Sequence, residues 1–242
     1  LACWSTYPAK IRVEADATLK QVDIMGNERP VEVKNGAAEF ALDNTPFYLR
    51  GAVKAVSELS TGRTIIADMG EDYSREQGTT GWYYGYMDGT GGGEGNSADP
   101  SGPYTDDDFK QFKVEVTAWG ERWTGPQKYL GANRGNLHPG VSNGKAVWAV
   151  QRWKSSAEGP AKIEGAVERN GKGDGITFIV MEDGRKLYEH KVGGAAPAKN
   201  DFTTDINLKK GACIDFIVTP GPANDLSFDA TTLDARIIIT DK

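Results

Sequence analysis

The sequence is poor in cysteine and histidine, and it has no long apolar run. Cys3 and Cys213 are its only cysteines, a count that fits one disulfide or two thiols equally well. No stretch approaches the about 18 apolar residues that a membrane span needs, so we expect no membrane partner. No segment has apolar residues at the 3.6-residue spacing of an amphipathic helix, which favours an all-β fold.

Basic residues are scarce around the most aromatic stretch, residues 72–88. Between positions 66 and 108 there are ten acidic residues and a single basic one, Arg75. Within this stretch four aromatic residues crowd between glycines at positions 82, 83, 84 and 86. Such rings either fill a core or offer stacking platforms. Because an acidic segment repels phosphates, we expect no nucleic-acid partner. Within this stretch no nucleophile has a base beside it, which favours binding over catalysis.

Glycine is abundant, with 30 residues that fall mostly between short apolar runs, as the many turns of a β protein require. The pattern predicts strands at 10–15, 19–25, 31–34, 38–42, 47–50, 63–68, 110–119, 146–153, 161–168, 176–182, 186–191, 202–208, 212–219 and 235–240. Residues 121–144 read as loop, and 89–103 as a long polar excursion. Evenly spaced strands with such turns indicate an antiparallel, jelly-roll-like β-sandwich.

The chain divides into two expected parts, residues 1–58 and 59–242, at a small polar cluster that spans 56–62. The first part holds about half of the ~100 residues of a typical sandwich, so we expect it to pack against a neighbour. Because the sequence begins with Leu1 rather than Met, we expect a longer polypeptide.

Two stretches resemble known families. The runs Val-Asp-Ile-Met-Gly-Asn at 22–27, Asn-Gly-Ala-Ala-Glu-Phe-Ala-Leu at 35–42 and Thr-Pro-Phe-Tyr-Leu-Arg-Gly at 45–51 are similar to the closing strands of the small β-lobe that follows the catalytic barrel in bacterial glycoside hydrolases. This resemblance implies that residues 1–58 belong to, or pack beside, such a lobe.

Residues 63–242 carry an ordered set of landmarks: Gln-Gly at 77–78, Trp-Tyr-Tyr-Gly-Tyr at 82–86, His-Pro-Gly at 138–140, Ala-Val at 146–147, Gln-Arg-Trp at 151–153, Gly159 with Ile-Glu-Gly at 163–165, Gly-Asp-Gly-Ile at 173–176, Gly211 with Ile-Asp-Phe at 214–216, and Phe-Asp-Ala-Thr at 228–231. The set resembles a carbohydrate-binding β-sandwich module of large bacterial polysaccharide-degrading enzymes. Two positions depart from that pattern: Gln151 stands where a basic residue is usual, and Cys213 replaces a turn aspartate.

The resemblance implies a noncatalytic module that tethers a polysaccharide-degrading enzyme to its polymer. It also implies a covalently linked catalytic domain upstream, and an extracellular or cell-surface location. Pyranose rings pack on aromatic planes and hydrogen-bond to planar polar groups. The candidate carbohydrate-binding residues are Trp119, Trp123, Tyr84, Tyr86, Trp148, Arg152 and His138. Trp82 and Trp153 are expected in the core.

Other functions stay open at this point. A hydrolase or lyase could use Glu121, Asp174 or His138, although no spacing singles out a pair. A purely structural sandwich fits the fold as well. No cofactor is required, but a structural calcium ion is possible, with Asp68, Asp72 and Asp229 as candidate ligands and the acidic run at 106–108 as another source. A basic stretch that includes Arg122 and Lys128 leaves acidic sugars possible.

Overall fold

The computed structural model describes most of the chain. The described ranges are 1–4, 9–16, 18–42, 45–59, 63–88, 106–118, 120–169, 172–193, 197–220 and 226–240. The predicted excursion at 89–103 and the candidate Trp119 lie outside them. The chain forms two compact units, residues Leu1–Thr64 and Ile65–Thr240.

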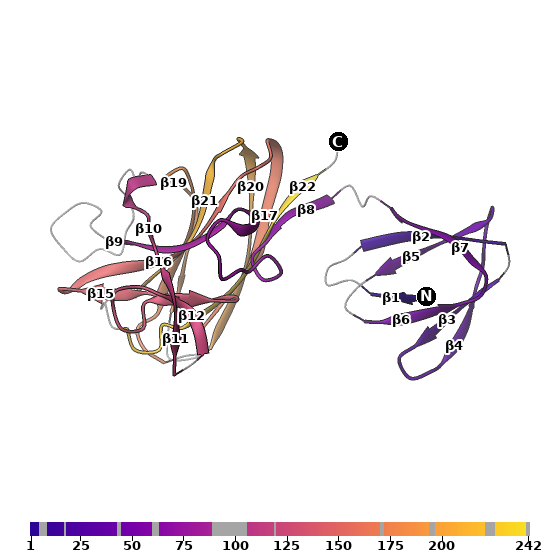
Figure 1. The fold of residues 1–242 in the computed structure, drawn as a ribbon, viewed down its shortest axis with the longest axis horizontal. Coiled ribbons are helices and arrows are strands. Elements are labelled where there is room, and N and C mark those ends of the chain that lie inside the picture. Colours follow the sequence, from indigo (N-terminus) through magenta and orange to yellow (C-terminus); the bar gives the residue numbers. More distant parts are fainter. Residues whose placement is uncertain are drawn as a thin grey trace. The chain divides into compact units, whose positions relative to one another are not determined.

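The first unit contains two small antiparallel sheets (Figure 1). One has the strand order β1 (Ala2–Cys3), β6 (Phe47–Arg50), β3 (Leu19–Asp23) and β4 (Glu28–Val31), and the other β5 (Ala37–Leu42), β2 (Ala9–Ala15) and β7 (Val53–Leu59). Val13, Leu19, Phe40 and Phe47 are among the side chains of a core within this unit. The segment thus has a core of its own, which its length did not lead us to expect.

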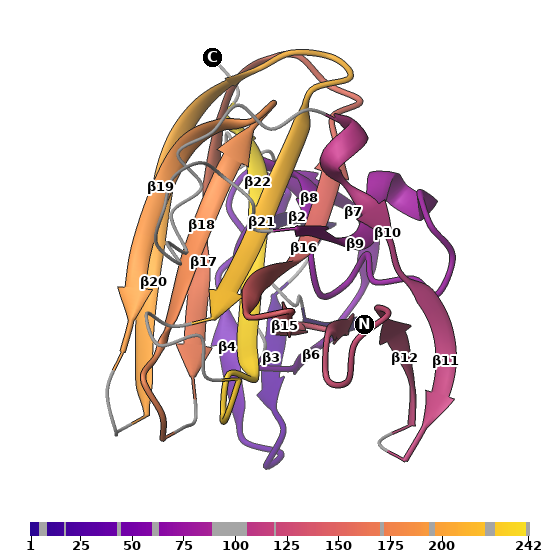
Figure 2. The ribbon, with the colours of Figure 1, turned by 90° about the vertical axis from the view of Figure 1, so that its left-hand side faces the viewer.

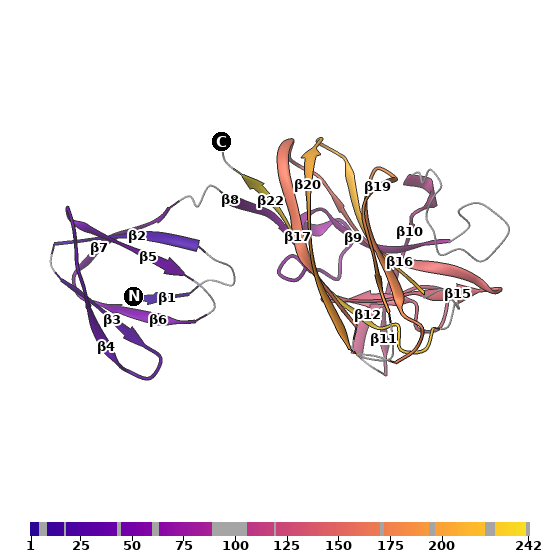
Figure 3. The same cartoon turned by 180° about the vertical axis from the view of Figure 1, so that it is seen from behind.

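The second unit is a sandwich of two antiparallel sheets. The first sheet, seen face-on in Figure 2, has the order β10 (Lys110–Gln111), β9 (Trp82–Asp88), β16 (Lys145–Lys154), β21 (Cys213–Pro220), β18 (Ile176–Glu182) and β19 (Arg185–Val192), and β15 (Gly140–Ser142) also pairs with β16. The second sheet, partly visible from behind in Figure 3, has the order β11 (Lys113–Thr117), β12 (Gly120–Thr124), β13 (Gly131–Asn133), β14 (Asn136–His138), β22 (Thr231–Thr240), β17 (Gly159–Arg169) and β20 (Ala198–Leu208). In addition, β8 (Arg63–Asp68) pairs with β22.

The prediction of an all-β sandwich is therefore confirmed. The main core lies between the two sheets of the second unit and includes the fully buried Trp82 and Trp153, as expected. A second cluster of buried apolar side chains, which includes Trp148, Ile179 and Ile217, lies on the opposite face of strands β9, β16, β21 and β18. This sheet is therefore buried on both of its faces, which favours nearly continuous apolar strands such as β18.

Two local predictions are wrong. Residues 110–119 do not form one strand: the chain breaks between β10 and β11, and Phe112 turns into the core while Val116 stays 85 % exposed. Residues 121–144, predicted as loop, contain most of β12 and all of β13, β14 and β15. Three of these four strands have only three residues, too few for a period-two pattern to be recognised.

Helical structure is limited to two short 3-10 turns in the described ranges, η1 (Thr79–Gly81) and η2 (Asp106–Asp108). Within these ranges there is also no helix with the length and hydropathy to cross a membrane. Cys3 and Cys213 are both buried and form no disulfide with each other; they belong to different units. Burial raises the pKa of the Cys3 thiol.

Gly165 provides a test of the close approach between β17 and β22. A β-carbon at this position would lie 2.0 Å from the Asp234 carbonyl oxygen, and backbone cannot move aside as a side chain can. We expect Gly165→Ala to lower the free energy of unfolding of the second unit by about 2 kcal/mol or more. Chemical denaturation followed by tryptophan fluorescence measures this loss. Ala166→Ser, one residue along the strand, is the control; equal midpoints for both variants would contradict the prediction.

Candidate functional site

The structure places two of the predicted platform residues, Tyr84 and Trp123, inside the core. Their rings stack on each other with centroids 5.1 Å apart and an interplanar angle of 12°, and their side chains are 0 % and 3 % exposed. Trp123 Nε1 donates to the Ser74 carbonyl oxygen at 3.1 Å, and the Tyr84 hydroxyl accepts from the Ser74 N–H at 3.2 Å. Burial raises the pKa of Tyr84 to about 12. A sugar cannot reach these rings, so the expectation of a platform here is wrong.

The predicted patch of Trp148 and Arg152 is likewise buried. Trp148 has no exposed surface, because its face of β16 is covered. Arg152 Nε donates to Asp215 Oδ1 at 2.6 Å and Arg152 Nη2 donates to Asp215 Oδ2 at 2.9 Å, while the Phe109 ring lies 4.4 Å from the guanidinium carbon. This fork already satisfies the charge of Arg152. The pair therefore holds neighbouring strands together and does not form a sugar-binding patch.

Tyr86 is half-buried and stays a prediction. Its ring stacks on Phe112 at 5.7 Å between centroids and lies 5.8 Å from Lys110 Nζ. Because Phe112 belongs to the core, the stacking anchors Tyr86 at the end of β9 near β10.

The three candidate metal ligands do not converge. Asp68 Oδ1 accepts from the Gly70 and Glu71 N–H groups, and its Oδ2 accepts from Arg236 Nε at 2.8 Å. Asp72 Oδ2 accepts from the Asp68 N–H at 2.8 Å. The buried Asp229 lies 3.9 Å from the Arg169 guanidinium, far along β17 from the part that faces Arg236. Among the described residues no three acidic, histidine or cysteine side chains group to hold a metal ion.

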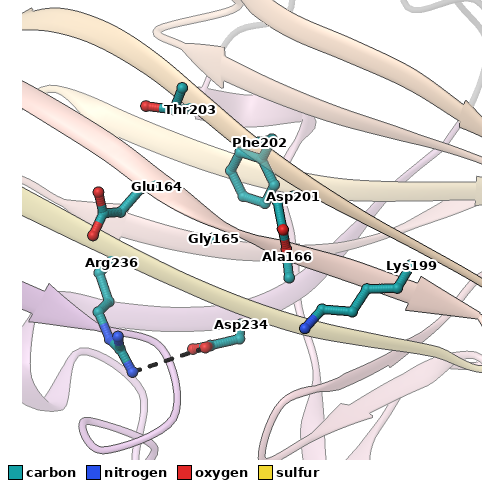
Figure 4. A pocket seen from close by; sticks show the side chains of 9 residues that line it. All are labelled: Glu164, Gly165, Ala166, Lys199, Asp201, Phe202, Thr203, Asp234 and Arg236. Atoms are coloured by element: carbon teal, nitrogen blue, oxygen red, sulfur yellow. Dashed lines mark ion pairs between the residues drawn. The ribbon is translucent and has the colours of Figure 1, made fainter. Parts of the chain in front are cut away.

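In two of three surface hollows in the second unit, the arginines of the lining already pair with carboxylates. In the first, on β17, β20 and β22, Arg236 points toward Asp234 at 3.8 Å and also pairs with Asp68 (Figure 4). Its aromatic ring, Phe202, is only 4 % exposed. In another hollow, Arg75 pairs with Glu121 at 2.7 Å. The aromatic residue of this second hollow, Tyr73, is partly buried and packs edge-on against the Tyr84 ring at 5.3 Å between centroids.

The third hollow differs, and we call it the Tyr129 hollow. It lies at the β11–β12 hairpin and the loop that follows β12, and has a volume of about 440 Å³. Its lining consists of Glu115, Thr117, Arg122, Thr124, Gly125, Pro126, Gln127, Lys128, Tyr129 and Leu130. Arg122 and Thr124 project from the face of β12 opposite to Trp123, because side chains alternate along a strand. The volume falls in the range of roughly 300–1,000 Å³ that is typical of ligand pockets.

Two glycines make room for polar side chains here. A β-carbon at Gly131 would lie 2.7 Å from Arg122 Nη2, and one at Gly140 would lie 2.5 Å from Gln127 Oε1. Both side chains therefore lie flat against backbone. Arg122 Nε and Gln127 Oε1 are buried and have no hydrogen-bond partner within the described part of the chain. An unmatched buried donor or acceptor is costly, so a ligand or water that reached these atoms would be bound favourably.

Tyr129 supplies the aromatic plane. Its side chain is 42 % exposed and its φ is +75°, a left-handed conformation that is rare for a bulky residue. Backbone strain of this kind persists where the surrounding structure imposes it, and it is concentrated at functional sites. Lys128 Nζ lies 4.8 Å from the centre of the ring, and the His138 ring centre lies 5.8 Å away.

His138, a predicted site residue, therefore lies beside this hollow. Its Nδ1 is 2.8 Å from the Pro139 carbonyl oxygen. Burial lowers the pKa of His138, the nearby charge of Arg122 lowers it further, and the Pro139 carbonyl acts in the opposite direction. The net result is a pKa below the usual value, so the imidazole is neutral at pH 7.

The sequence did not single out Tyr129. It lies between Lys128 and Leu130 in a stretch without periodicity, and its positive φ cannot be recognised without a structure. The available signal was the pair of glycines at positions 125 and 131 that enclose the loop. The predicted catalytic alternative gains no support at this place, because Glu115 is the only acidic residue in the described lining and Glu121 pairs with Arg75.

Comparison with known proteins gives low similarity throughout. No protein-family model and no curated protein matches the chain. The solved structures that resemble it are mainly carbohydrate-binding modules and glycoside hydrolases. One is an isomalto-dextranase from Arthrobacter globiformis T6 complexed with panose, with 12 % identity over 97 % of this chain and a TM-score of 0.31. This chain spans about a third of that protein, 33 % of its length.

Two further examples are carbohydrate-binding modules. The N-terminal CBM22 tandem of Xyn10C from Paenibacillus barcinonensis matches 99 % of this chain and 81 % of its own, with 9 % identity and a TM-score of 0.35. The C-terminal CBM6 of LamC from Zobellia galactanivorans matches 63 % of this chain and 96 % of its own, with 13 % identity and a TM-score of 0.27. At such values the function must rest on the residues of this chain.

The strain at Tyr129 can be measured. Glycine adopts a positive φ without steric cost, whereas alanine keeps the β-carbon that causes the strain. We expect Tyr129→Gly to be more stable to unfolding than Tyr129→Ala by about 1 kcal/mol. Chemical denaturation of both variants gives the difference. A more stable alanine variant would show that the backbone relaxes when the ring is removed.

His138 predicts a pH dependence of stability. The native state disfavours the imidazolium ion, whereas the unfolded chain binds a proton below about pH 6.5. The free energy of unfolding should therefore be highest above that pH and should decrease as the pH is lowered through it. His138→Gln should flatten the curve, measured by denaturation between about pH 5 and pH 8. His190→Gln, which removes the only other histidine, should leave the fall in place.

Proposed function

We propose that the second unit is a noncatalytic carbohydrate-binding module, and that the Tyr129 hollow is its binding site. The observation that carries the proposal is the exposed, strained Tyr129 ring beside Arg122 Nε and Gln127 Oε1, two buried polar atoms without partners in the described residues. A pyranose has an apolar C–H face and a rim of hydroxyl groups. The hollow offers one partner for each: a ring for the face and planar polar groups for the hydroxyls.

The chemistry of the lining fits hydroxyl recognition. The guanidinium of Arg122 only donates, whereas Gln127 Oε1 accepts, so together they can bind a hydroxyl group that both accepts and donates. Thr124 adds a further hydroxyl on the same face of β12. His138 lies behind the ring and is neutral, so it packs beside Tyr129 without adding a charge to the wall.

The biological role that we propose is tethering. A module that binds a polymer raises the local concentration of any catalytic domain on the same polypeptide. In this proposal that domain lies upstream, and the protein acts outside the cell or at its surface. Residues 1–58 would belong to the β-lobe that follows the catalytic domain. The resemblance of both parts of the sequence to pieces of polysaccharide-degrading enzymes supports this arrangement.

Affinity electrophoresis tests the proposal. The full chain is run through gels that contain plant, algal and bacterial polysaccharides, neutral and acidic, while reducing-sugar release is followed in parallel. Retardation without release supports a binding module. Release of product would show that the protein is an enzyme instead. If no polymer retards the chain and none is degraded, a structural β-sandwich is the remaining interpretation.

The site is tested by removing the ring. We expect Tyr129→Gly to weaken binding about tenfold or more, since a central aromatic contact usually contributes over 1 kcal/mol. Tyr48→Ala removes a tyrosine of comparable exposure, 51 %, from the first unit and should leave binding unchanged. Equal affinity of the Tyr129 variant and the parent protein would move the site elsewhere.

A further inference from the structure

We infer that the Tyr129 hollow selects acidic sugars, those that carry a carboxylate or a sulfate group, over neutral ones. Arg122 and Lys128 would bind the anionic group while the Tyr129 ring packs against the sugar. This inference rests on the proposed function and adds to it the chemical class of the ligand. Three features of the hollow carry it: a cation without a counter-charge among the described residues, a second cation at the aromatic ring, and a donor set that matches an oxyanion.

Arg122 has no ionic partner among the residues that the structure describes. Its side chain is half-buried, and its described contact is a donation from Nη2 to the Tyr129 carbonyl oxygen at 3.3 Å. Glu115 faces Arg122 across the β11–β12 pair, yet no ion pair forms between them. Burial lowers the pKa of Arg122, because its charge is partly removed from water without compensation. Such a charge favours the approach of an anion.

Other arginines of the second unit have their positive charge compensated by a carboxylate. Arg152 pairs with Asp215, Arg236 with Asp68 and Arg134 with Glu71, at distances of 2.6, 2.8 and 2.9 Å. Each of them has a structural partner in the fold. Arg122 lies against Gly131, but none of the described carboxylates pairs with it. Its guanidinium is therefore available for a ligand in a way that theirs are not.

Lys128 is the second cation. It forms no ion pair among the described residues, and its ammonium group lies 4.8 Å from the centre of the Tyr129 ring, within the range of a cation–π contact. An exposed contact of this kind is weak, about 0.5–1 kcal/mol, and the lysine stem is flexible. A sugar can therefore displace the ammonium group from the ring. If the sugar is acidic, Lys128 exchanges the ring for an ion pair.

The donor set fits an oxyanion. The guanidinium presents parallel N–H groups that match a carboxylate or a sulfate, and Arg122 Nε is the buried donor that the fold leaves without a partner. A neutral hydroxyl can occupy the same place but cannot neutralise two cations. Selectivity for the acid should therefore come from these two side chains, whereas the Tyr129 ring should contribute equally to both kinds of sugar.

The experiment compares matched polymers in affinity electrophoresis and isothermal titration calorimetry. Each acidic polysaccharide is paired with its own carboxyl-reduced form, or with its desulfated form, so that only the anionic group differs. We expect the acidic member to bind about tenfold more tightly or better. Raising the salt from about 0.05 M to about 0.5 M should reduce that preference. Whether the carboxylate or the sulfate pairs show it identifies the source of the anion.

The variants assign the preference to the two cations. Arg122→Gln and Lys128→Gln should each reduce the preference for the acidic polymer, by about tenfold for Arg122. Lys128→Gln should leave affinity for the neutral partner within about twofold, whereas Arg122→Gln should also weaken neutral binding, but less than acidic binding, because Arg122 donates to sugar hydroxyls as well. Arg122→Lys keeps the charge and should retain part of the preference. Lys145→Gln removes one charge from the start of β16, outside the hollow lining, and should change nothing.

Three results are distinguishable. A preference that disappears in Arg122→Gln supports the inference. Equal binding of both members of every pair, still lost in Tyr129→Gly, would overturn the inference but leave the carbohydrate-binding site in place. No binding of any polymer by the parent protein would overturn the proposed function and the inference with it.

Discussion

Strand β16 is covered on both of its faces, and this burial determines which surfaces of the second unit are available to a ligand. Every residue from Ala146 to Trp153 is buried, with Trp153 in the main core and Trp148 in the second apolar cluster. Strand β16 therefore cannot present an aromatic plane to a polymer. The candidate site lies instead on the second sheet, at the β11–β12 hairpin, where one face of β12 contacts the core and the other faces the Tyr129 hollow.

The architecture could be predicted where the physical signals are strong. Long alternating or apolar runs such as β17, β18 and β21 were recognised because their period and their flanking turns agree. The short strands β13, β14 and β15 were missed, since three residues carry no period and their pairing depends on partners far along the chain, as β14 depends on β22. Val53–Leu59 was missed because most of its residues are exposed, which removes the contrast between its two faces.

The candidate site was less predictable than the fold. Counting aromatic residues led to Trp123 and Trp148, but a tryptophan buries a large apolar area, and the core takes most of the tryptophans that the structure describes. Tyr129 is distinguished by its backbone conformation and by its neighbours Arg122 and His138, and neither property follows from local sequence. Of the predicted binding residues that the structure describes, only His138 lies at this hollow. A lack of partners, as for Arg122 Nε, becomes visible only when every neighbour has been placed.

The net charge of −6 raises the question of whether an acidic polymer can approach this protein at all. Charges more than a Debye length apart, about 8 Å at physiological salt, are largely screened. Those acidic residues between positions 66 and 108 that the structure describes do not line the hollow. They therefore act on a bound polyanion less directly than Arg122 and Lys128, which are at contact distance in a partly desolvated hollow. Attraction at contact with weak repulsion at a distance gives selectivity without fast electrostatic steering. An acidic protein can thus bind an acidic polymer at one local cationic site.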